Sequence, residues 1–124
     1  MAVILVVEDN PANLKLATFL LESAGHSVII ATDAEAGLMM ARYEHPNLIL
    51  MDIQLPGMDG LTATAQLKAA EETKHIPVIA LTALAMKGDE ERIRAAGCDG
   101  YIAKPLAYKE FLVSIAAYLE RAPV

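Results

Sequence analysis

Short hydrophobic runs divide the chain, and the residues within them do not alternate between apolar and polar. Four runs are continuously hydrophobic, and a fifth, weaker one is assigned from its position. Strands that are buried on both faces of a sheet show this pattern. The predicted strands are Val3 to Val7, Val28 to Ala31, Leu48 to Met51, Val78 to Leu81 and Gly100 to Ala103.

The segments between these runs repeat hydrophobic residues at the spacing of an amphipathic helix. Asn10 and Pro11 are typical of a helix N-cap and the first helical position, and Gly25 is typical of the end of that helix. Thr32 and Glu35 have the spacing of a capping box for the next helix. The chain is therefore expected to alternate strand and helix five times.

The connections between these elements are too short for anything but right-handed parallel crossovers. The expected fold class is α/β: a doubly wound, flavodoxin-like (βα)5 sandwich around a five-stranded parallel sheet of order 2-1-3-4-5. The 124 residues fall in the size range of one domain, which is expected to span residues 1–124.

Polar residues follow the predicted strands at the points where the strands end. Glu8 and Asp9 follow the first strand, Asp52 the third, Thr82 the fourth and Lys104 the fifth. In an open doubly wound sheet, ligands bind beyond the carboxyl ends of the strands, where the strand order reverses. For this order the point lies between the first and third strands, so Glu8, Asp9 and Asp52 are expected to lie together.

Three neighbouring carboxylates repel one another, and a hard cation relieves that repulsion. Mg²⁺ suits such a site because it binds a few carboxylates and completes its coordination with water and a phosphate oxygen. Lys104 and Thr82 could each hold an oxygen of a transferred phosphoryl group. Asp52 is the candidate nucleophile, because carboxylates form acyl phosphates and the irregular loop after it, residues 53–60, offers backbone polar groups.

Charge and composition exclude several classes of partner. The formal net charge of −6 at pH 7 leaves no basic patch for nucleic acid or for an anionic membrane. No apolar run approaches membrane-spanning length, and Met1 to Val7 lacks the basic flank of a signal peptide. Cys98 is the single cysteine, which fits a reducing compartment. The expected location is the cytoplasm.

Four short motifs fall on the predicted strand ends. They are VEDN at Val7 to Asn10, MDIQLPGMDG at Met51 to Gly60, LTA at Leu81 to Ala83 and YIAKP at Tyr101 to Pro105. Each is weak alone, but in this order and at these spacings they resemble the CheY-like receiver domains of response regulators in two-component signalling. The stretch Ala85 to Arg92 is also similar to that of DivK-type single-domain regulators.

The resemblance implies a phosphorylation-activated signalling domain. Asp52 would accept a phosphoryl group from a phosphohistidine on a sensor histidine kinase or a histidine phosphotransfer protein, with Mg²⁺ or Mn²⁺ bound. Asp9 would bind the metal directly, Glu8 directly or through water, and Gln54 through its carbonyl group. Such a domain catalyses its own phosphorylation and dephosphorylation but is not a turnover enzyme.

The resemblance also implies a way to hold the phosphoryl group and to report it. Backbone N–H groups of Ile53 and Ala83 would bind its oxygens, and a cis peptide bond before Pro105 would aim Lys104 at the site. Thr82 would move toward the phosphoryl group, and Tyr101 would turn into the vacated space. That movement would change the face made by the fourth helix, fifth strand and fifth helix, which would bind a downstream protein target.

Two further expectations concern the lifetime and the output of the phosphorylated state. Leu84, two residues past Thr82, is expected to shield the acyl phosphate from water. Only Arg121 to Val124 follow the fifth helix, so no output domain is expected on this chain. A free-standing regulator, a phosphorelay shuttle and the receiver module of a hybrid kinase remain alternatives.

Each of these residues also has a purely structural interpretation. Glu8 and Asp9 could complement a helix N-terminus, and Asp52 could form a turn. Thr82 could simply end a strand, and Tyr101 could be a half-buried core aromatic.

Two rival functions also remain open. A metal-dependent phosphohydrolase of the haloacid-dehalogenase type would carry an aspartate two positions after the nucleophile, where this chain has Gln54. A flavodoxin-like cofactor binder would need a glycine-rich phosphate loop after the first strand, where Glu8 and Asp9 would repel an anion.

Overall fold

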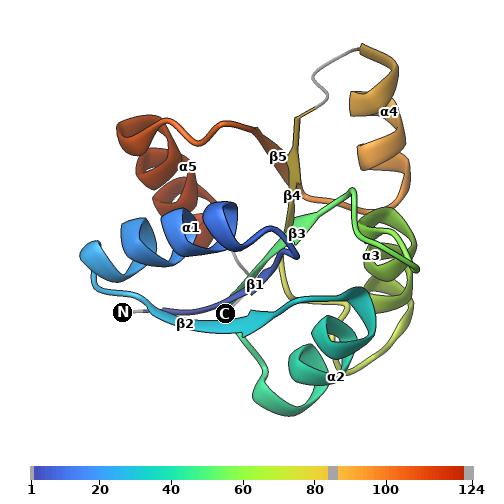
Figure 1. Cartoon of the computed structure of the whole chain (residues 1–124). Helices are drawn as coiled ribbons and strands as arrows, with labels where there is room; N and C mark the ends of the chain where they lie inside the picture. The colour runs from blue at the N-terminus through green and yellow to red at the C-terminus, as the bar shows by residue number, and fades with distance from the viewer. Residues whose placement is uncertain (1, 84–86, 122–124) are drawn as a thin grey trace.

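The computed structural model describes residues 2–83 and 87–121. Within these residues, strands and helices alternate along the whole chain (Figure 1). The elements are β1 (Val3–Val7), α1 (Pro11–Ser23), β2 (Ser27–Ala31), α2 (Ala34–Glu44), β3 (Leu48–Asp52), α3 (Gly60–Ala69), β4 (Val78–Thr82), α4 (Lys87–Ala95), β5 (Gly100–Ala103) and α5 (Tyr108–Arg121). No helix in the described residues is both long and hydrophobic enough to span a bilayer.

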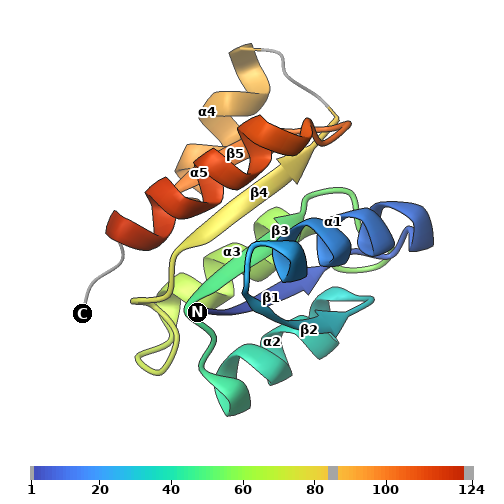
Figure 2. The same ribbon diagram turned by 90° about the vertical axis from the view of Figure 1, so that its left-hand side faces the viewer.

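The five strands form one parallel sheet of order β2-β1-β3-β4-β5, which confirms the predicted fold class. Helices α1 and α5 cover one face of this sheet, and α2, α3 and α4 cover the other (Figures 1 and 2). The arrangement follows from the parallel crossovers, each of which carries the chain across a face of the sheet.

Two hydrophobic layers form the core, one on each face of the sheet. The side chains of β1 alternate between them: Leu5 and Val7 pack toward α2 and α3, and Ile4 and Val6 pack toward α1 and α5. Every residue of β3 and β4 is buried. The continuous hydrophobic runs of these strands are therefore explained by burial on both faces.

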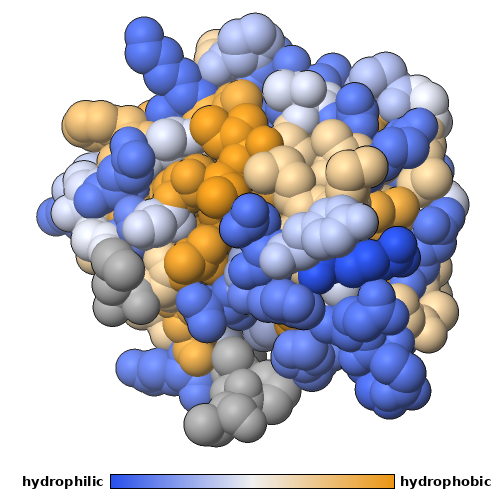
Figure 3. Space-filling model, turned by 90° about the horizontal axis from the view of Figure 1, so that it is seen from below, coloured by the Kyte–Doolittle hydropathy of each residue, from blue (hydrophilic) through white to orange (hydrophobic). Residues whose placement is uncertain are grey.

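The two edge strands, β2 and β5, are less buried than their hydrophobic sequences predicted. In β2 only Ala31 is buried, and Ile30 is 41% exposed; no residue of β5 is fully buried. Hydrophobic side chains gather on the lower side of the molecule, where Figure 1 places β2 (Figure 3). Exposed Phe19 of α1 lies on the same apolar groove as Ile30. A hydrophobic run alone does not separate a central strand from an edge strand, because both have apolar sequences.

Helix starts are fixed by side chains that cap free backbone N–H groups. The Asn10 side chain accepts hydrogen bonds from the N–H groups of Ala12 and Asn13, which confirms it as the N-cap of α1. The predicted capping box at Thr32 is wrong, since Asp33 caps α2 by accepting from the Ala36 N–H at 2.7 Å. The aspartate carboxylate lies one residue closer to the helix than the threonine and is a stronger cap.

Candidate functional site

The parallel strands place the predicted polar residues at one edge of the sheet. Glu8 directly follows β1, and Asp52 and Thr82 are the last residues of β3 and β4. Asp52 lies beside Leu81 in the register, and Thr82 beside Ala103, which precedes Lys104. The carboxyl ends of four strands therefore meet where the order of the sheet reverses, as predicted.

Three carboxylates come together at this edge. One oxygen each of Glu8, Asp9 and Asp52 lies within 4.8 Å of the other two. Glu8 and Asp52 are buried, at 1% and 3% exposure, whereas Asp9 is exposed. The cluster is thus buried at Glu8 and Asp52 and open to solvent at Asp9.

Lys104 supplies the positive charge that faces two of these acids. Its Nζ lies 2.8 Å from Glu8 Oε1 and 3.2 Å from Asp52 Oδ2. Its backbone N–H donates to the Thr82 carbonyl at 2.8 Å, and the peptide bond to Pro105 is cis. The structure therefore directs the lysine side chain into the site.

Backbone N–H groups bind the remaining oxygens of the two buried acids. Glu8 Oε2 accepts from the N–H groups of Asp9 and Asn10, at 3.1 and 3.4 Å. Asp52 Oδ1 accepts from the N–H of Gln54 at 3.0 Å. Each buried carboxylate therefore has one oxygen on the backbone and the other at ion-pair distance from Lys104, and within the described residues Glu8 Oε1 makes no hydrogen bond.

The electrostatics follow from two buried acids sharing one base. Burial and neighbouring Glu8 raise the pKa of Asp52 from 3.8 to about 6, although the Gln54 N–H and Lys104 oppose this rise. Burial also acts to raise the pKa of Glu8, but hydrogen bonds with Asp52 and Lys104 outweigh it, so that pKa is lowered. Burial acts to lower the pKa of Lys104, yet the two carboxylates raise it. The two buried acids thus carry one more negative charge than the single lysine can balance at neutral pH.

The loop after Asp52 places two backbone amides and one residue that the sequence did not single out. The Ile53 N–H donates to the Leu81 carbonyl at 3.2 Å, so it continues the pairing of β3 with β4 and is not directed at Asp52. The amide that faces the Asp52 carboxylate is that of Gln54. At Gly60, a Cβ atom would overlap the Asp52 carbonyl oxygen, so only glycine fits there. In the sequence, the signal for this glycine was its place at the end of the motif MDG.

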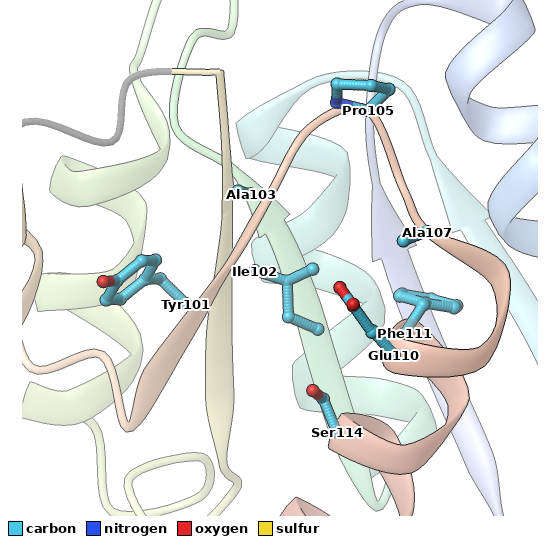
Figure 4. Close-up of a pocket in the computed structure, with 8 residues that line it drawn as sticks. All are labelled: Tyr101, Ile102, Ala103, Pro105, Ala107, Glu110, Phe111 and Ser114. Carbon is cyan, nitrogen blue, oxygen red and sulfur yellow. The ribbon is translucent and has the colours of Figure 1, made fainter.

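The expected switch residues lie on the neighbouring strands. Thr82 is 1% exposed, and Ala83, the next residue, is exposed. Tyr101 is half-buried against the core on the α2, α3 and α4 side. In the close-up, its ring lies on the opposite side of β5 from Ile102 and Phe111 (Figure 4). Leu84, the expected shield, lies outside the described residues.

Comparison with known proteins agrees with this geometry. The response regulator receiver domain family matches residues 4–116. The chain belongs to this family: it is a response regulator receiver domain of two-component signalling, with a phosphorylatable aspartate site marked by the acidic cluster, and it is not a turnover enzyme. Membership implies a histidine kinase as partner.

Individual relatives make the relationship more specific. The chain is 52% identical over 116 residues to the polar-differentiation response regulator DivK of Brucella ovis, covering 94% of both chains. It is 36% identical to the receiver domain of a sensor histidine kinase from Pseudomonas aeruginosa, solved with magnesium coordinated in the active site cleft, with a TM-score of 0.85 and coverage of 98% and 96%. A manganese-bound response regulator, Rcp1, is 29% identical, with a TM-score of 0.80 and coverage of 100% and 99%.

Proposed function

We propose that Asp52 is the phosphoacceptor of this receiver domain and that the domain takes in residues 1–124. The observation that carries the proposal is the position of its carboxylate. Asp52 Oδ2 lies 3.2 Å from the Lys104 ammonium, and the same side chain belongs to the cluster with Glu8 and Asp9. A buried acid with a pKa of about 6 is still mainly ionised at neutral pH, so it can act as a nucleophile.

The acidic cluster fits a divalent cation, either Mg²⁺ or Mn²⁺. Its oxygens lie close enough to share one ion, and Asp9 leaves an open side where water and a phosphate oxygen could complete the coordination. Asp9 and Asp52 would supply carboxylate oxygens, Gln54 would supply its carbonyl, and Glu8 would bind the ion directly or through water. A bound cation would neutralise the acids and hold an oxygen of the phosphoryl group. Relatives bound to magnesium and to manganese support this assignment.

The chain's own groups account for the transfer step. An Asp52 carboxylate oxygen attacks phosphorus, the bond from phosphorus to the donor's imidazole nitrogen breaks, and the electron pair leaves on that nitrogen. Lys104 and the Thr82 hydroxyl bind phosphoryl oxygens, and the N–H groups of Gln54 and Ala83 bind the others. Catalysis of this kind consists mainly of positioning and charge stabilisation.

The signal would pass to a downstream protein through the face of α4, β5 and α5. Movement of Thr82 toward the phosphoryl group would let Tyr101 change position on β5. A cavity of about 240 Å³ lies along β5 and α5, lined by Tyr101, Glu110 and Phe111 among others (Figure 4). We therefore propose that the downstream protein binds here. We also propose that a histidine kinase or a histidine phosphotransfer protein donates the phosphoryl group, and that the protein acts in the cytoplasm.

Intact-protein mass spectrometry after incubation with acetyl phosphate and Mg²⁺ tests the proposal. We expect one added phosphoryl group, which is not formed when the metal is chelated first and is absent in Asp52→Asn. Asp99→Asn is the matched control, because it removes the same charge at the opposite, amino-terminal edge of the sheet and its side-chain oxygen can still accept the Val78 N–H. Equal phosphorylation of Asp52→Asn and wild type would refute the assignment.

A further inference from the structure

We propose that the groove between α1 and β2 is a self-association surface, on which a second copy of this chain packs its own α1 antiparallel to the first across a two-fold axis. The inference is separate from the phosphoacceptor function, because the residues that line the groove belong neither to the acidic cluster nor to the ion pairs of Lys104.

The groove runs along one edge of the molecule. β2 is the edge strand next to β1, and α1 lies beside it (Figure 1). The groove has a volume of about 370 Å³ and is lined by one face of α1 and by Ile30 of β2. Phe19 is 65% exposed and Ile30 41%, and hydrophobic side chains gather on this side of the molecule (Figure 3). Large apolar side chains that share one solvent-facing groove mark a site of contact with another protein surface.

Two opposite charges frame this groove. Lys15, Thr18, Phe19 and Glu22 lie on one face of α1, because residues spaced by three, four and seven positions share a helix face. Lys15 and Glu22 lie about 10 Å apart along the helix axis, with Phe19 between them. Both charged residues are exposed, and within residues 2–83 and 87–121 neither side chain has an ion pair or a hydrogen bond.

This arrangement of charges is complementary to itself. A two-fold axis places the same patch on both copies, so each residue contacts the counterpart of its own partner. When two α1 helices pack antiparallel, with the axis midway between positions 15 and 22, Lys15 of each copy faces Glu22 of the other. The two Phe19 rings then meet beside the axis. A second copy therefore pairs both charges and covers both rings, whereas a partner of one charge sign would pair only one of them.

A second pair of exposed apolar side chains, on α2, differs in its charges. Met39 is 60% exposed and Tyr43 75%. The charged residue between them in the sequence, Arg42, already forms an ion pair with Glu72, with Nε 3.2 Å from Oε2. Arg42 is therefore engaged within its own chain, and the α2 patch provides the internal comparison for the groove.

Sedimentation velocity between about 10 µM and about 1 mM protein tests the self-association. One helix face and the end of one strand make a small interface, so we expect a dissociation constant on the order of 100 µM. Phe19→Ser should raise this constant about thirtyfold, since a central aromatic side chain dominates such a contact. Tyr43→Ser, the matched control on α2, should leave it unchanged. A wild-type protein that is still monomeric at about 1 mM would overturn the inference and leave the groove to a different partner.

Charge reversal identifies the occupant as a second copy. Lys15→Glu and Glu22→Lys each replace two attractive contacts by two repulsive ones, and each should weaken association about tenfold. An equimolar mixture of the two variants should restore association, because every acid of one variant then faces a lysine of the other. Glu44→Lys makes the same charge change at an exposed position on α2 and should associate like the wild type. A mixture that associates no more tightly than the single variants would overturn the proposed packing.

Discussion

Two lysine contacts lie at opposite ends of the same sheet, and they differ in burial and in charge balance. At the amino end, Lys68 Nζ lies 2.8 Å from Asp99 Oδ2 and 2.8 Å from the Ile76 carbonyl. The same Asp99 oxygen accepts the Val78 N–H at 2.8 Å. At the carboxyl end, Lys104 faces two buried acids, with a third beside them.

The difference shows which end serves stability and which serves chemistry. Lys68 and Asp99 form a balanced pair whose other contacts are backbone groups, and they join α3 to the starts of β4 and β5. The Lys104 site has an excess of negative charge that folding does not relieve, and one of its acids has its pKa raised to about 6. Unbalanced buried charge is typical of functional sites, because a ligand can supply the missing counter-charge.

The largest expected effect is a difference in phosphorylation rate between the variants that lack Lys104 and Lys68. Lys104→Met should slow phosphorylation by acetyl phosphate about a hundredfold, since one donor to a developing anion is worth about 10²–10³ in rate. The phosphorylation rate of Lys68→Met should stay within about twofold of the wild-type rate. A loss of about a hundredfold requires removal of a donor to the reacting anion, and Lys68 lies at the other end of the sheet. The rates are read by mass spectrometry over time. Equal losses in the two variants would remove the distinction between the two ends.

The free energy of unfolding should depend on Lys68, although the phosphorylation rate should not. Lys68→Met leaves the Ile76 carbonyl without its lysine donor, whereas Asp99 is 46% exposed and keeps the Val78 N–H, so the expected cost is about 1.5 kcal/mol of unfolding free energy. Lys74→Met is the matched control: its ion pair with Glu71 is exposed, and such pairs contribute about 0–1 kcal/mol. Urea unfolding measures both. A Lys68 variant no less stable than the Lys74 variant would contradict a structural role for the amino-end pair.

Removing the charge of Asp52 should stabilise the fold at neutral pH. A pKa raised from 3.8 to about 6 means that the folded protein holds the proton more tightly than the unfolded chain. Ionisation of Asp52 therefore destabilises the fold. This penalty is absent below about pH 4 and complete above about pH 6. Asp52→Asn should be more stable by about 2 kcal/mol at pH 7, which is less than the whole pKa difference is worth, because an amide NH₂ group then faces Lys104 where a carboxylate oxygen stood.

Urea unfolding of wild type and Asp52→Asn between pH 4 and pH 7 measures this difference. The advantage of the variant should shrink as the pH falls from 6 and should vanish near pH 4. An Asp52→Asn variant that is less stable than wild type at pH 7 would show that the site is not charge-unbalanced.

A divalent cation should stabilise the fold by a smaller amount. At ten times its dissociation constant, Mg²⁺ should raise the free energy of unfolding by about 1.4 kcal/mol. Asp9→Asn should abolish this increment at the same concentration, whereas Asp99→Asn should retain it, since Asp99 lies at the other end of the sheet. Thermal unfolding with and without Mg²⁺ measures the increments. A cation effect that survives Asp9→Asn would place the ion elsewhere.

The sequence predicted the positions of the site residues because they directly follow hydrophobic strands. In a parallel sheet the carboxyl ends meet at one edge, so Glu8, Asp52 and Lys104 are brought together once the strand order is known. The pairing of individual oxygen atoms was beyond the sequence, because it depends on rotamers and loop geometry. The sequence therefore did not specify that the Gln54 N–H donates to Asp52 or that the Ile53 N–H donates to the Leu81 carbonyl.

Other features left no signal in the sequence. Lys68 in a helix and Asp99 before a strand match no motif, although the fold joins them at 2.8 Å. Thr32 and Asp33 both qualify as caps, and the path of the chain into α2 decides between them. The exposure of Ile30 depends on β2 being an edge strand, which is a property of the assembled sheet.

Chemical mapping of the phosphorylated residue is the decisive experiment on Asp52 as the phosphoacceptor. Borohydride reduces an aspartyl phosphate to homoserine, and peptide mass spectrometry then locates the converted residue. After treatment with acetyl phosphate and Mg²⁺, we expect conversion of Asp52 alone. Conversion of Asp9 or Asp59 with Asp52 intact, or no conversion in a protein that has taken up phosphate, would show that Asp52 does not accept the phosphoryl group.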